Sequence, residues 1–178
     1  AKEAFDALTA NQQTYVTNSA ALQAAVSALN DLQWDGTTLT EPAVNDGIYQ
    51  ITAGAELAWF AREVNSGNYT IDGILRNNID LGAHPWTPIG IGSRDNDNEF
   101  IEYKGTFDGH SHAIDGLHIE NGDLYIGLFG KTGGDCVIND LTVKGSINAS
   151  ASYMGGIAGM LSGTISNCHS YVNIRQWS

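Results

Sequence analysis

Residues 105–143 contain three phrases marked by small or turn-forming residues: GTFDGHSHAIDGL (105–117), IGLFG (126–130) and VINDLTV (137–143). Each phrase combines a short apolar, strand-like run with glycine, asparagine or aspartate, which are the residues that favour tight corners. The chain holds 21 glycines but only 3 prolines. This composition is typical of repeated corners between strands.

The phrases return at a long and similar interval. The phrase Ile-x-x-Leu at 114–117 returns at 138–141, and then as Ile-Ser-Asn-Cys at 165–168. The glycine phrase at 126–130 returns at 155–159, and residues 78–81 are a candidate for an earlier coil. A strand-and-turn repeat with an interval of this size indicates a solenoid.

Two solenoids have periods in this range, the leucine-rich repeat and the parallel β-helix. The first requires Leu-x-x-Leu-x-Leu with an asparagine at a fixed offset, which is absent. We therefore expect a mainly β fold, a parallel β-helix with coils of about 24–29 residues. The residues expected to form its repeat are Phe107, Asp108, Gly109, Ile114, Gly116, Leu117, Gly127, Leu128, Phe129, Gly130, Ile138, Leu141, Gly156, Ile157, Gly159, Ile165 and Cys168.

The composition changes along the chain and predicts its organisation. Residues 1–33 are rich in Ala, Leu and Gln, and Thr9 with Gln12 fits a helix capping box, so this part is expected to be a helical spacer. Residues 34–47 carry turn signals and are expected to be a linker. The β-helix is expected over 48–178, truncated at its C-terminal end, with a helix at about 56–64 that caps its first strand edge.

Two resemblances accompany this pattern. Residues 4–25 resemble a helical segment common in large surface proteins of Gram-positive bacteria, which implies a spacer. The phrases at 86–90, 107–109, 114–117, 127–130 and 155–159 resemble the GLUG-type repeats of bacterial cell-surface proteins. Those repeats occur in adhesin-like proteins and beside the catalytic regions of some immunoglobulin A proteases. The second resemblance covers about residues 48–174 and implies a right-handed parallel β-helix, although Cys168 replaces the usual leucine.

The charge excludes some partners. The chain carries 20 acidic and 8 basic residues, a formal net charge of −12, which disfavours nucleic acid and anionic lipid. Calcium or a neutral glycan fits this charge, as does a role in solubility alone. No apolar stretch is long enough for a transmembrane helix, so no membrane insertion is expected. Cys136 and Cys168 are expected to be unpaired.

Three groups of residues are candidate sites, each with a structural alternative. Asp95, Asp97 and Glu99 alternate in a polar loop and offer oxygen ligands for Ca²⁺, but the EF-hand pattern is absent and a solvated loop is favoured. His110 and His112, with Asp108 and Asp115 nearby, are candidates for a ligand-binding site that holds a metal or transfers a proton, because residues two apart share one face of a strand. The alternative is that Asp108 forms a corner there. Trp34 is a candidate for an exposed sugar-stacking platform, whereas Trp59 and Trp86 are expected in the core or cap.

The expected function is a non-catalytic structural or adhesive module of an exported bacterial surface protein that contacts a host protein or glycan. The alternatives are an accessory region of a secreted protease, or a carbohydrate-active enzyme. A glycoside hydrolase would need two carboxylates, for which Asp80, Glu102, Asp108 and Asp140 are available. A polysaccharide lyase would need a basic residue beside acids, for which Arg76 and Lys104 are the candidates. The His-Glu-x-x-His, Gly-x-Ser-x-Gly and phosphate-loop motifs are absent. No cofactor other than Ca²⁺ is expected.

Overall fold

The computed structural model describes residues 6–9, 12–13, 22–24, 33–92, 100–120 and 124–177. The chain divides into two compact units, Ala1–Gln33 and Trp34–Ser178. Most of the expected helical spacer lies outside the described residues. Its capping box is confirmed, because the Thr9 N–H donates to Gln12 Oε1 (2.9 Å) and the Gln12 N–H donates to Thr9 Oγ1 (3.3 Å).

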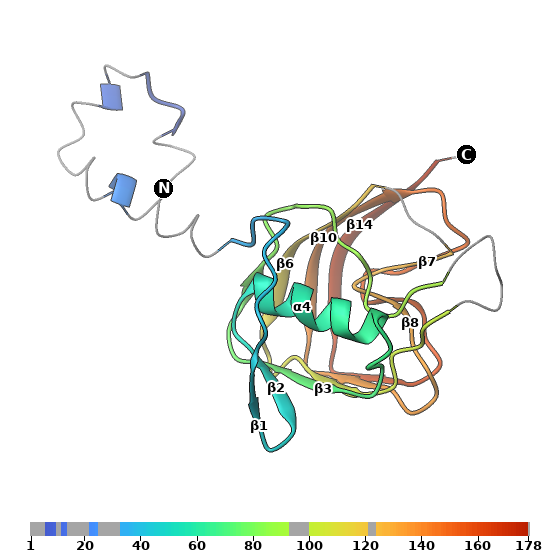
Figure 1. Ribbon diagram of the computed structural model, residues 1–178. Coiled ribbons are helices and arrows are strands. Elements are labelled where there is room, and N and C mark those ends of the chain that lie inside the picture. Colours follow the sequence, from blue (N-terminus) through green and yellow to red (C-terminus); the bar gives the residue numbers. More distant parts are fainter. Residues whose placement is uncertain are drawn as a thin grey trace. The chain divides into compact units, whose positions relative to one another are not determined.

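The second unit is a parallel β-solenoid (Figure 1), as the repeat predicts. One wall is a six-stranded sheet in the order β1 (Ala43–Asn45), β2 (Ile48–Ile51), β3 (Asp72–Leu75), β5 (Thr106–Asp108), β9 (Val137–Asn139) and β13 (Thr164–Ser166). A second wall has the order β14 (His169–Gln176), β10 (Thr142–Ala149), β6 (Ala113–Ile119) and β4 (Ile79–Asp80). The third side pairs β7 (Tyr125–Ile126) with β11 (Tyr153–Met154), and β8 (Phe129–Lys131) with β12 (Ala158–Met160).

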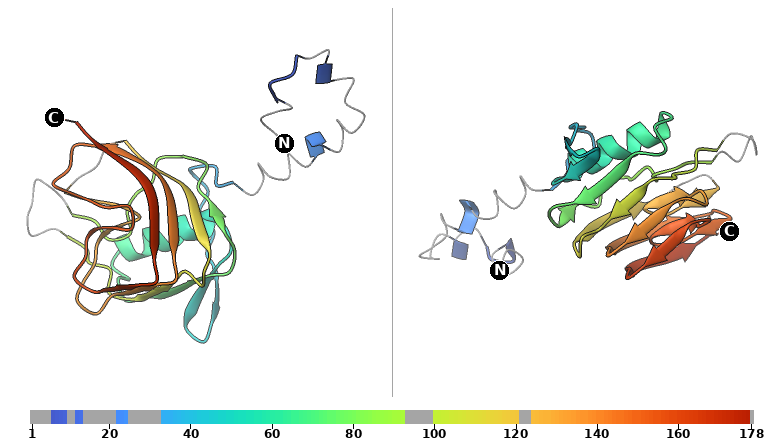
Figure 2. Two further views of the ribbon diagram at one scale, coloured as in Figure 1. Left: turned by 180° about the vertical axis from the view of Figure 1, so that it is seen from behind. Right: turned by 90° about the horizontal axis from the view of Figure 1, so that it is seen from below.

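The four-stranded wall takes one strand from each coil, so the solenoid has about four coils, which are stacked in Figure 2. The strands pair in parallel, except that β1 and β2 form an antiparallel hairpin. Parallel pairing follows from the coil itself, because each strand lies on the strand one circuit earlier.

The strand register tests the predicted repeat. Ile165 pairs with Ile138 and Ala158 pairs with Phe129, which confirms the alignment of 165–168 with 138–141 and of 155–159 with 126–130. The alignment of 138–141 with 114–117 is wrong: Ile114 pairs with Val143, whereas Ile138 pairs with Phe107. The two Ile-x-x-Leu phrases look alike but belong to different walls, because 114–117 lies inside β6 while 138–141 crosses the corner between β9 and β10.

The coils are also less uniform than expected. Ile48 pairs with Asp72 one circuit later, but the partner of Ile79 is Ile114, so the circuit that follows β4 is considerably longer. The longer circuit contains the predicted insertion at 93–99, which lies outside the described residues. The residues on either side of it, Gly92 and Phe100, form an antiparallel bridge.

Apolar side chains fill the inside of the coils in stacked columns. Phe107 pairs with Ile138 of the next coil. Across the interior, the ring centroid of Phe107 lies 5.3 Å from that of Phe129. Tyr103 stacks on Phe129 at 5.5 Å and donates its hydroxyl to the Ile71 carbonyl (3.0 Å). The side chains of Tyr103, Phe107, Phe129 and Ile138 are all fully buried, so each coil completes the core of its neighbour.

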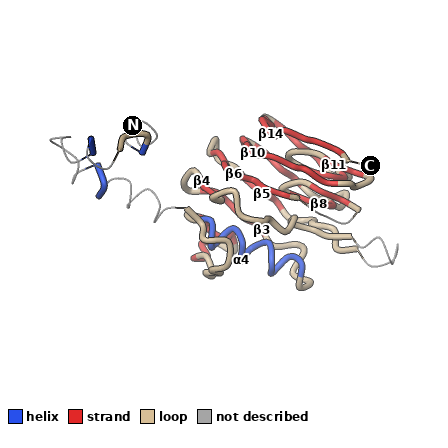
Figure 3. Tube along the Cα trace, turned by 90° about the horizontal axis from the view of Figure 1, so that it is seen from above, coloured by secondary structure: helices blue, strands red, loops and turns tan. Residues whose placement is uncertain are grey.

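Helix α4 (Gly54–Asn65) covers the N-terminal end of the stack (Figure 3). It contains the predicted helix 56–64 and buries Leu57, Phe60, Ala61 and Val64 against the first coil. The Phe60 ring lies 5.9 Å from both the Tyr103 and the Phe107 rings. The helix therefore closes the end of the core that would otherwise meet water.

Residues 34–47 are not only a linker, as expected, but also pack against the first coil. Trp34 is only 8 % exposed, its backbone N–H donates to the Asp80 carbonyl (2.9 Å), and β1 extends the first coil as a hairpin. A Cβ on Gly54 would lie 2.5 Å from Trp34 Cβ, so the start of α4 accepts the tryptophan only because residue 54 has no side chain.

We expect Phe60→Ala to reduce the free energy of unfolding by about 3–5 kcal/mol, because it removes a buried ring from the junction of helix and coils. Urea unfolding followed by tryptophan fluorescence measures this loss. Leu39→Ala is the control, since Leu39 is 40 % exposed and surface changes have effects within about 0.5 kcal/mol. Equal effects of the two substitutions would contradict a stabilising role for the helix contact.

Candidate functional site

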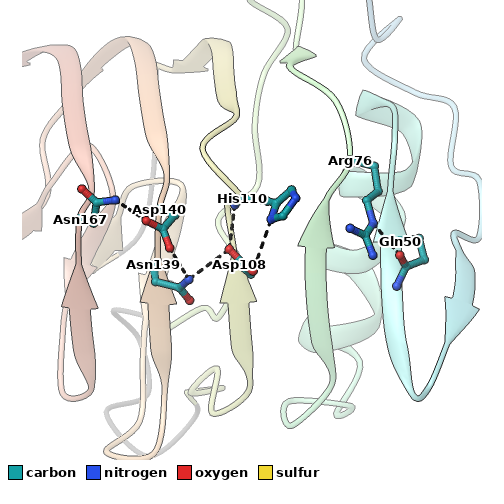
Figure 4. Close-up of polar contacts among 7 residues, drawn as sticks. All are labelled: Gln50, Arg76, Asp108, His110, Asn139, Asp140 and Asn167. Atoms are coloured by element: carbon teal, nitrogen blue, oxygen red, sulfur yellow. Dashed lines mark hydrogen bonds and ion pairs between the residues drawn. The ribbon is translucent and has the colours of Figure 1, made fainter.

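Polar side chains gather at the corner between the six-stranded and four-stranded walls (Figure 4). The corner follows β5, β9 and β13 and precedes β6, β10 and β14. We call the side chains that connect the coils there the corner ladder, which consists of Asp108, Asn139, Asp140 and Asn167. Three successive coils contribute to it, so it runs along the solenoid and not around it.

Hydrogen bonds link the corner ladder from coil to coil. Asp108 Oδ1 accepts from the His110 backbone N–H (2.8 Å) and from Asn139 Nδ2 (3.1 Å). Asn139 Nδ2 also donates to Asp140 Oδ2 (2.9 Å), and Asn167 Nδ2 donates to Asp140 Oδ1. These acids and amides therefore hold neighbouring corners together.

The ladder also shifts the pKa of Asp140. The hydrogen bond from Asn139 lowers the pKa of this carboxyl below its ordinary value, and the bond from Asn167 and the charge of His110 act in the same direction. Asp140 and Asn167 have positive φ values of 53° and 50°. Asparagine and aspartate tolerate this left-handed backbone better than most residues do, which explains their presence at these corners.

The two histidines lie in a turn and not on the expected strand. His110 and Ser111 have φ values of 47° and 63°, and the His112 N–H closes the turn by donating to the Gly109 carbonyl (2.7 Å). The two imidazole rings are still neighbours, with centroids 6.1 Å apart. The corner interpretation of Asp108 is confirmed, because its carboxylate binds the backbone N–H two positions on.

Metal ligands do not converge in the described part of the chain, where no group of three or more His, Cys, Asp or Glu side chains could hold an ion. Asp95, Asp97 and Glu99, the expected Ca²⁺ ligands, lie outside the described residues. Ca²⁺ binding by this loop stays a prediction.

The prediction that Trp34 is exposed is wrong. Its indole packs edge to face against Trp86 at 5.9 Å, and its Nε1–H donates to the Thr38 carbonyl (2.8 Å). Asp35 holds this segment in place by accepting from the backbone N–H groups of Thr37 and Thr38. Trp86 is 5 % exposed, which confirms its expected core position. Both tryptophans line a hollow of about 370 Å³ beside α4.

Arg76 is also engaged between coils. Its Nε–H donates to Gln50 Oε1 (2.7 Å), which joins the corner after β3 to strand β2 (Figure 4). This pair lies at the N-terminal end of the same row of corners. It extends the pattern in which polar groups at the corners connect one coil to the next.

A second polar group lies on a different side and includes a residue that sequence reasoning missed. Glu102 Oε1 is 3.2 Å from Lys131 Nζ, and Glu102 Oε2 is 3.7 Å from Lys104 Nζ. Lys131 is 7 % exposed, and its Nζ lies 3.2 Å from the centroid of the Phe100 ring. The alternation of Glu102 and Lys104 is visible in the sequence. Lys131 belongs to the next coil, which the bridge between Tyr103 and Thr132 brings alongside.

A hollow of about 280 Å³ adjoins this group. We call it the aromatic hollow; its lining is Gly67, Tyr69, Phe100, Ile101, Glu102 and Lys104. Tyr69 and Phe100 are each 43 % exposed, and Lys104 Nζ lies 5.3 Å from the Tyr69 ring centroid. Exposed aromatic rings beside a carboxylate and an ammonium group can stack on a ligand ring and hydrogen-bond its polar substituents.

Both cysteines are free, as expected. Burial raises the pKa of the Cys136 thiol to about 12, and burial also raises the pKa of Cys168. Neither sulfur is a thiolate near neutral pH, so both act as small apolar groups. In the described part of the chain, no helix has the length and apolar character to cross a membrane.

Comparison with protein-family models, with curated proteins and with solved structures finds no match to this chain.

The corner ladder predicts a pH effect on stability. The pKa of Asp140 is lowered in the folded state, so its carboxylate stabilises the fold above the unfolded pKa of about 3.9. This stabilisation is lost as the pH falls through the lower, folded pKa. We expect Asp140→Asn to be less stable than the natural chain at pH 7 and the difference to shrink below about pH 4.

Urea unfolding between pH 2 and pH 7 measures the difference. Asp46→Asn is the matched control, because Asp46 lies exposed in the turn between β1 and β2. A difference between Asp140→Asn and the natural chain that stays constant over this range would contradict the role of the charged ladder.

Proposed function

We propose that this chain is a non-catalytic display module of an exported bacterial surface protein, in which a stiff solenoid presents a surface to a host protein or a glycan. One observation carries the proposal. The polar side chains of the corner ladder bind groups on the adjacent coil, so they serve the rigidity of the stack. A stiff stack holds surface groups in fixed positions and lowers the entropy lost on binding.

The aromatic hollow is the proposed contact surface. Tyr69 offers an exposed ring, while Glu102 and Lys104 offer a hydrogen-bond acceptor and a donor beside it. Sugars combine apolar ring faces with hydroxyl groups, so this combination suits a saccharide. The net charge of −12 favours a neutral glycan over an acidic one.

The extracellular, bacterial location rests on the two resemblances in the sequence. The glycine phrases are similar to repeats of cell-surface proteins, and the N-terminal residues are similar to a surface-protein spacer. Both would place the solenoid at a distance from the cell, where a host partner or glycan is accessible.

A carbohydrate-active enzyme is the second candidate, and the ion pairs of Glu102 with Lys104 and Lys131 favour it. A carboxylate and an ammonium group side by side next to a hollow are the acidic and basic residues that a polysaccharide lyase would need. Glu102 and Lys104 are among the residues that sequence reasoning offers for this role. A display module releases its bound glycan unchanged, whereas the enzyme would cleave it.

A glycan array probed with the labelled chain tests the proposal. We expect saturable binding to a defined set of neutral glycans. Tyr69→Ala should weaken the binding about two- to tenfold, since an aromatic contact contributes about 0.5–1.5 kcal/mol. Tyr171→Ala is the control, because this tyrosine is 67 % exposed on the four-stranded wall.

Incubation of the same chain with the bound glycans and with acidic polysaccharides separates the two functions. Unchanged glycans support the display module. Release of shorter saccharides that stops in Glu102→Gln would instead establish the enzyme and rule out the non-catalytic proposal.

A further inference from the structure

Four successive circuits of the solenoid each place one aromatic side chain on the outer surface. We call these side chains the aromatic row: Tyr69, Phe100, Tyr125 and Tyr153. The strand register defines the circuits, since β2 pairs with β3, β3 with β5, β5 with β9 and β9 with β13. The four members precede β3, β5, β9 and β13 in that order. Three of them are at least 43 % exposed, and Tyr125 is half-buried.

The row begins in the aromatic hollow, which both Tyr69 and Phe100 line. The Lys104 backbone N–H donates to the Tyr69 carbonyl (2.7 Å). The segment that carries Phe100 therefore lies beside the circuit that ends near Tyr69. The hollow thus spans two circuits and contains the first two members of the row.

Lys131 connects the hollow to the next circuit. Its Nζ lies 3.2 Å from the Phe100 ring centroid and 5.4 Å from the Tyr125 ring centroid. Glu102 holds the same ammonium group in an ion pair of 3.2 Å. A cation that attracts two rings and a carboxylate restrains all three. The two rings are therefore ordered before a ligand arrives, which lowers the entropy lost on binding.

The row continues on β7 and β11. Tyr125 and Tyr153 are register partners in this parallel pair, and their ring centroids lie 5.2 Å apart with the planes tilted by 32°. Gly92 makes room for the first of these rings, because a Cβ at position 92 would lie 2.6 Å from the Tyr125 ring. Gly92 is also the bridge partner of Phe100. The row is therefore continuous from the hollow to β11.

The aromatic row runs along the axis of the solenoid, because its members follow one another from circuit to circuit. A ligand that contacts all of them must be extended, must cross the strands and must meet one aromatic ring on each coil. An unbranched sugar chain has this form. Each of its rings offers an apolar face to an aromatic side chain, while its hydroxyl groups hydrogen-bond polar neighbours.

We propose that the aromatic hollow is the first part of a longer track, and that its ligand is a linear, neutral glycan lying along the aromatic row. The inference rests on the proposed glycan-binding function and specifies the ligand of that site. Glu102 and Lys104 hydrogen-bond the hydroxyl groups of the sugar in the hollow. Tyr125 and Tyr153 stack on sugars further along the same chain, so the site recognises the length of the glycan.

Two other extended ligands fit the row less well. Single-stranded nucleic acid also stacks on aromatic side chains, but it requires a positively charged groove. This chain has a net charge of −12, and Lys104 and Lys131 are both paired with Glu102. Proline-rich peptides bind aromatic grooves as well, but their prolines offer no N–H donor to Glu102.

Isothermal titration calorimetry with sugar chains of two lengths tests the track. The probes are cellobiose and cellohexaose, and chitobiose and chitohexaose, which are neutral and unbranched. We expect the longer chain of at least one series to bind about four- to hundredfold more tightly than the shorter one. The reason is that it also reaches Tyr125 and Tyr153, and each aromatic contact contributes about two- to tenfold in affinity.

Tyr153→Ala should weaken the binding of the longer chain about two- to tenfold and leave the binding of the shorter chain unchanged, because a disaccharide in the hollow does not reach β11. Tyr153→Phe keeps the ring and should keep the affinity. Tyr171→Ala is the matched control, since this tyrosine is also exposed but lies on the four-stranded wall. Circular dichroism checks that the variants are folded.

Equal affinities of the shorter and the longer chains would overturn the track and leave the hollow as the whole site. A longer chain that binds Tyr153→Ala as tightly as the natural protein would overturn it as well. If none of the four probes binds, the track is overturned, and the glycan array decides separately whether the hollow binds other glycans. Binding of a polyproline peptide that Tyr153→Ala weakens, without binding of the sugars, would assign the row to a protein partner and overturn the glycan.

Discussion

The structure depends on the stacking of side chains between coils. A single circuit cannot enclose its own apolar side chains, since its interior is one strand thick. Phe107 is fully buried because Ile138 lies on it in the next coil and Phe60 of α4 lies on the other side. Each layer therefore gains its stability from the layers next to it, and the ends of the stack are its weak points.

The same layering explains where the polar groups are. Corners expose backbone groups that the parallel ladders do not satisfy, and short amide and carboxylate side chains bind them locally. Asp108 illustrates this: one oxygen holds its own corner through the His110 N–H and the next coil through Asn139. In the sequence Asp108 looks like part of a histidine–aspartate site, whereas in the structure its carboxylate holds a corner and connects two coils.

Part of the fold could be predicted from the sequence, and the limits have physical causes. The period of the glycine phrases indicates a solenoid because every coil must turn at similar places, and the helix 56–64 is visible from its apolar face. The wrong alignment of 138–141 with 114–117 arises because Ile-x-x-Leu describes both a strand interior at Ile114 and a corner at Ile138. Local sequence does not distinguish the two, since only the stacking partner does.

Contacts between coils limit the prediction of side-chain roles in the same way. Trp34 lies in a stretch with turn signals and looks exposed, but a glycine at position 54 allows it to pack under the helix. Lys131 follows a glycine phrase with no acid beside it, yet Glu102 of the preceding coil is its partner. In each case the decisive neighbour lies far away along the chain and is absent from any local pattern.

The position of α4 at the N-terminal end has a consequence for how the protein is made. A ribosome delivers the chain from its N-terminus, so the helix and the first hairpin are complete before the later coils exist. The end covered by α4 then offers the edge of β2 and the apolar side chains of the helix to the coil that follows. The end that is synthesised first is therefore also the end that a helix closes, and the later coils extend the stack away from it.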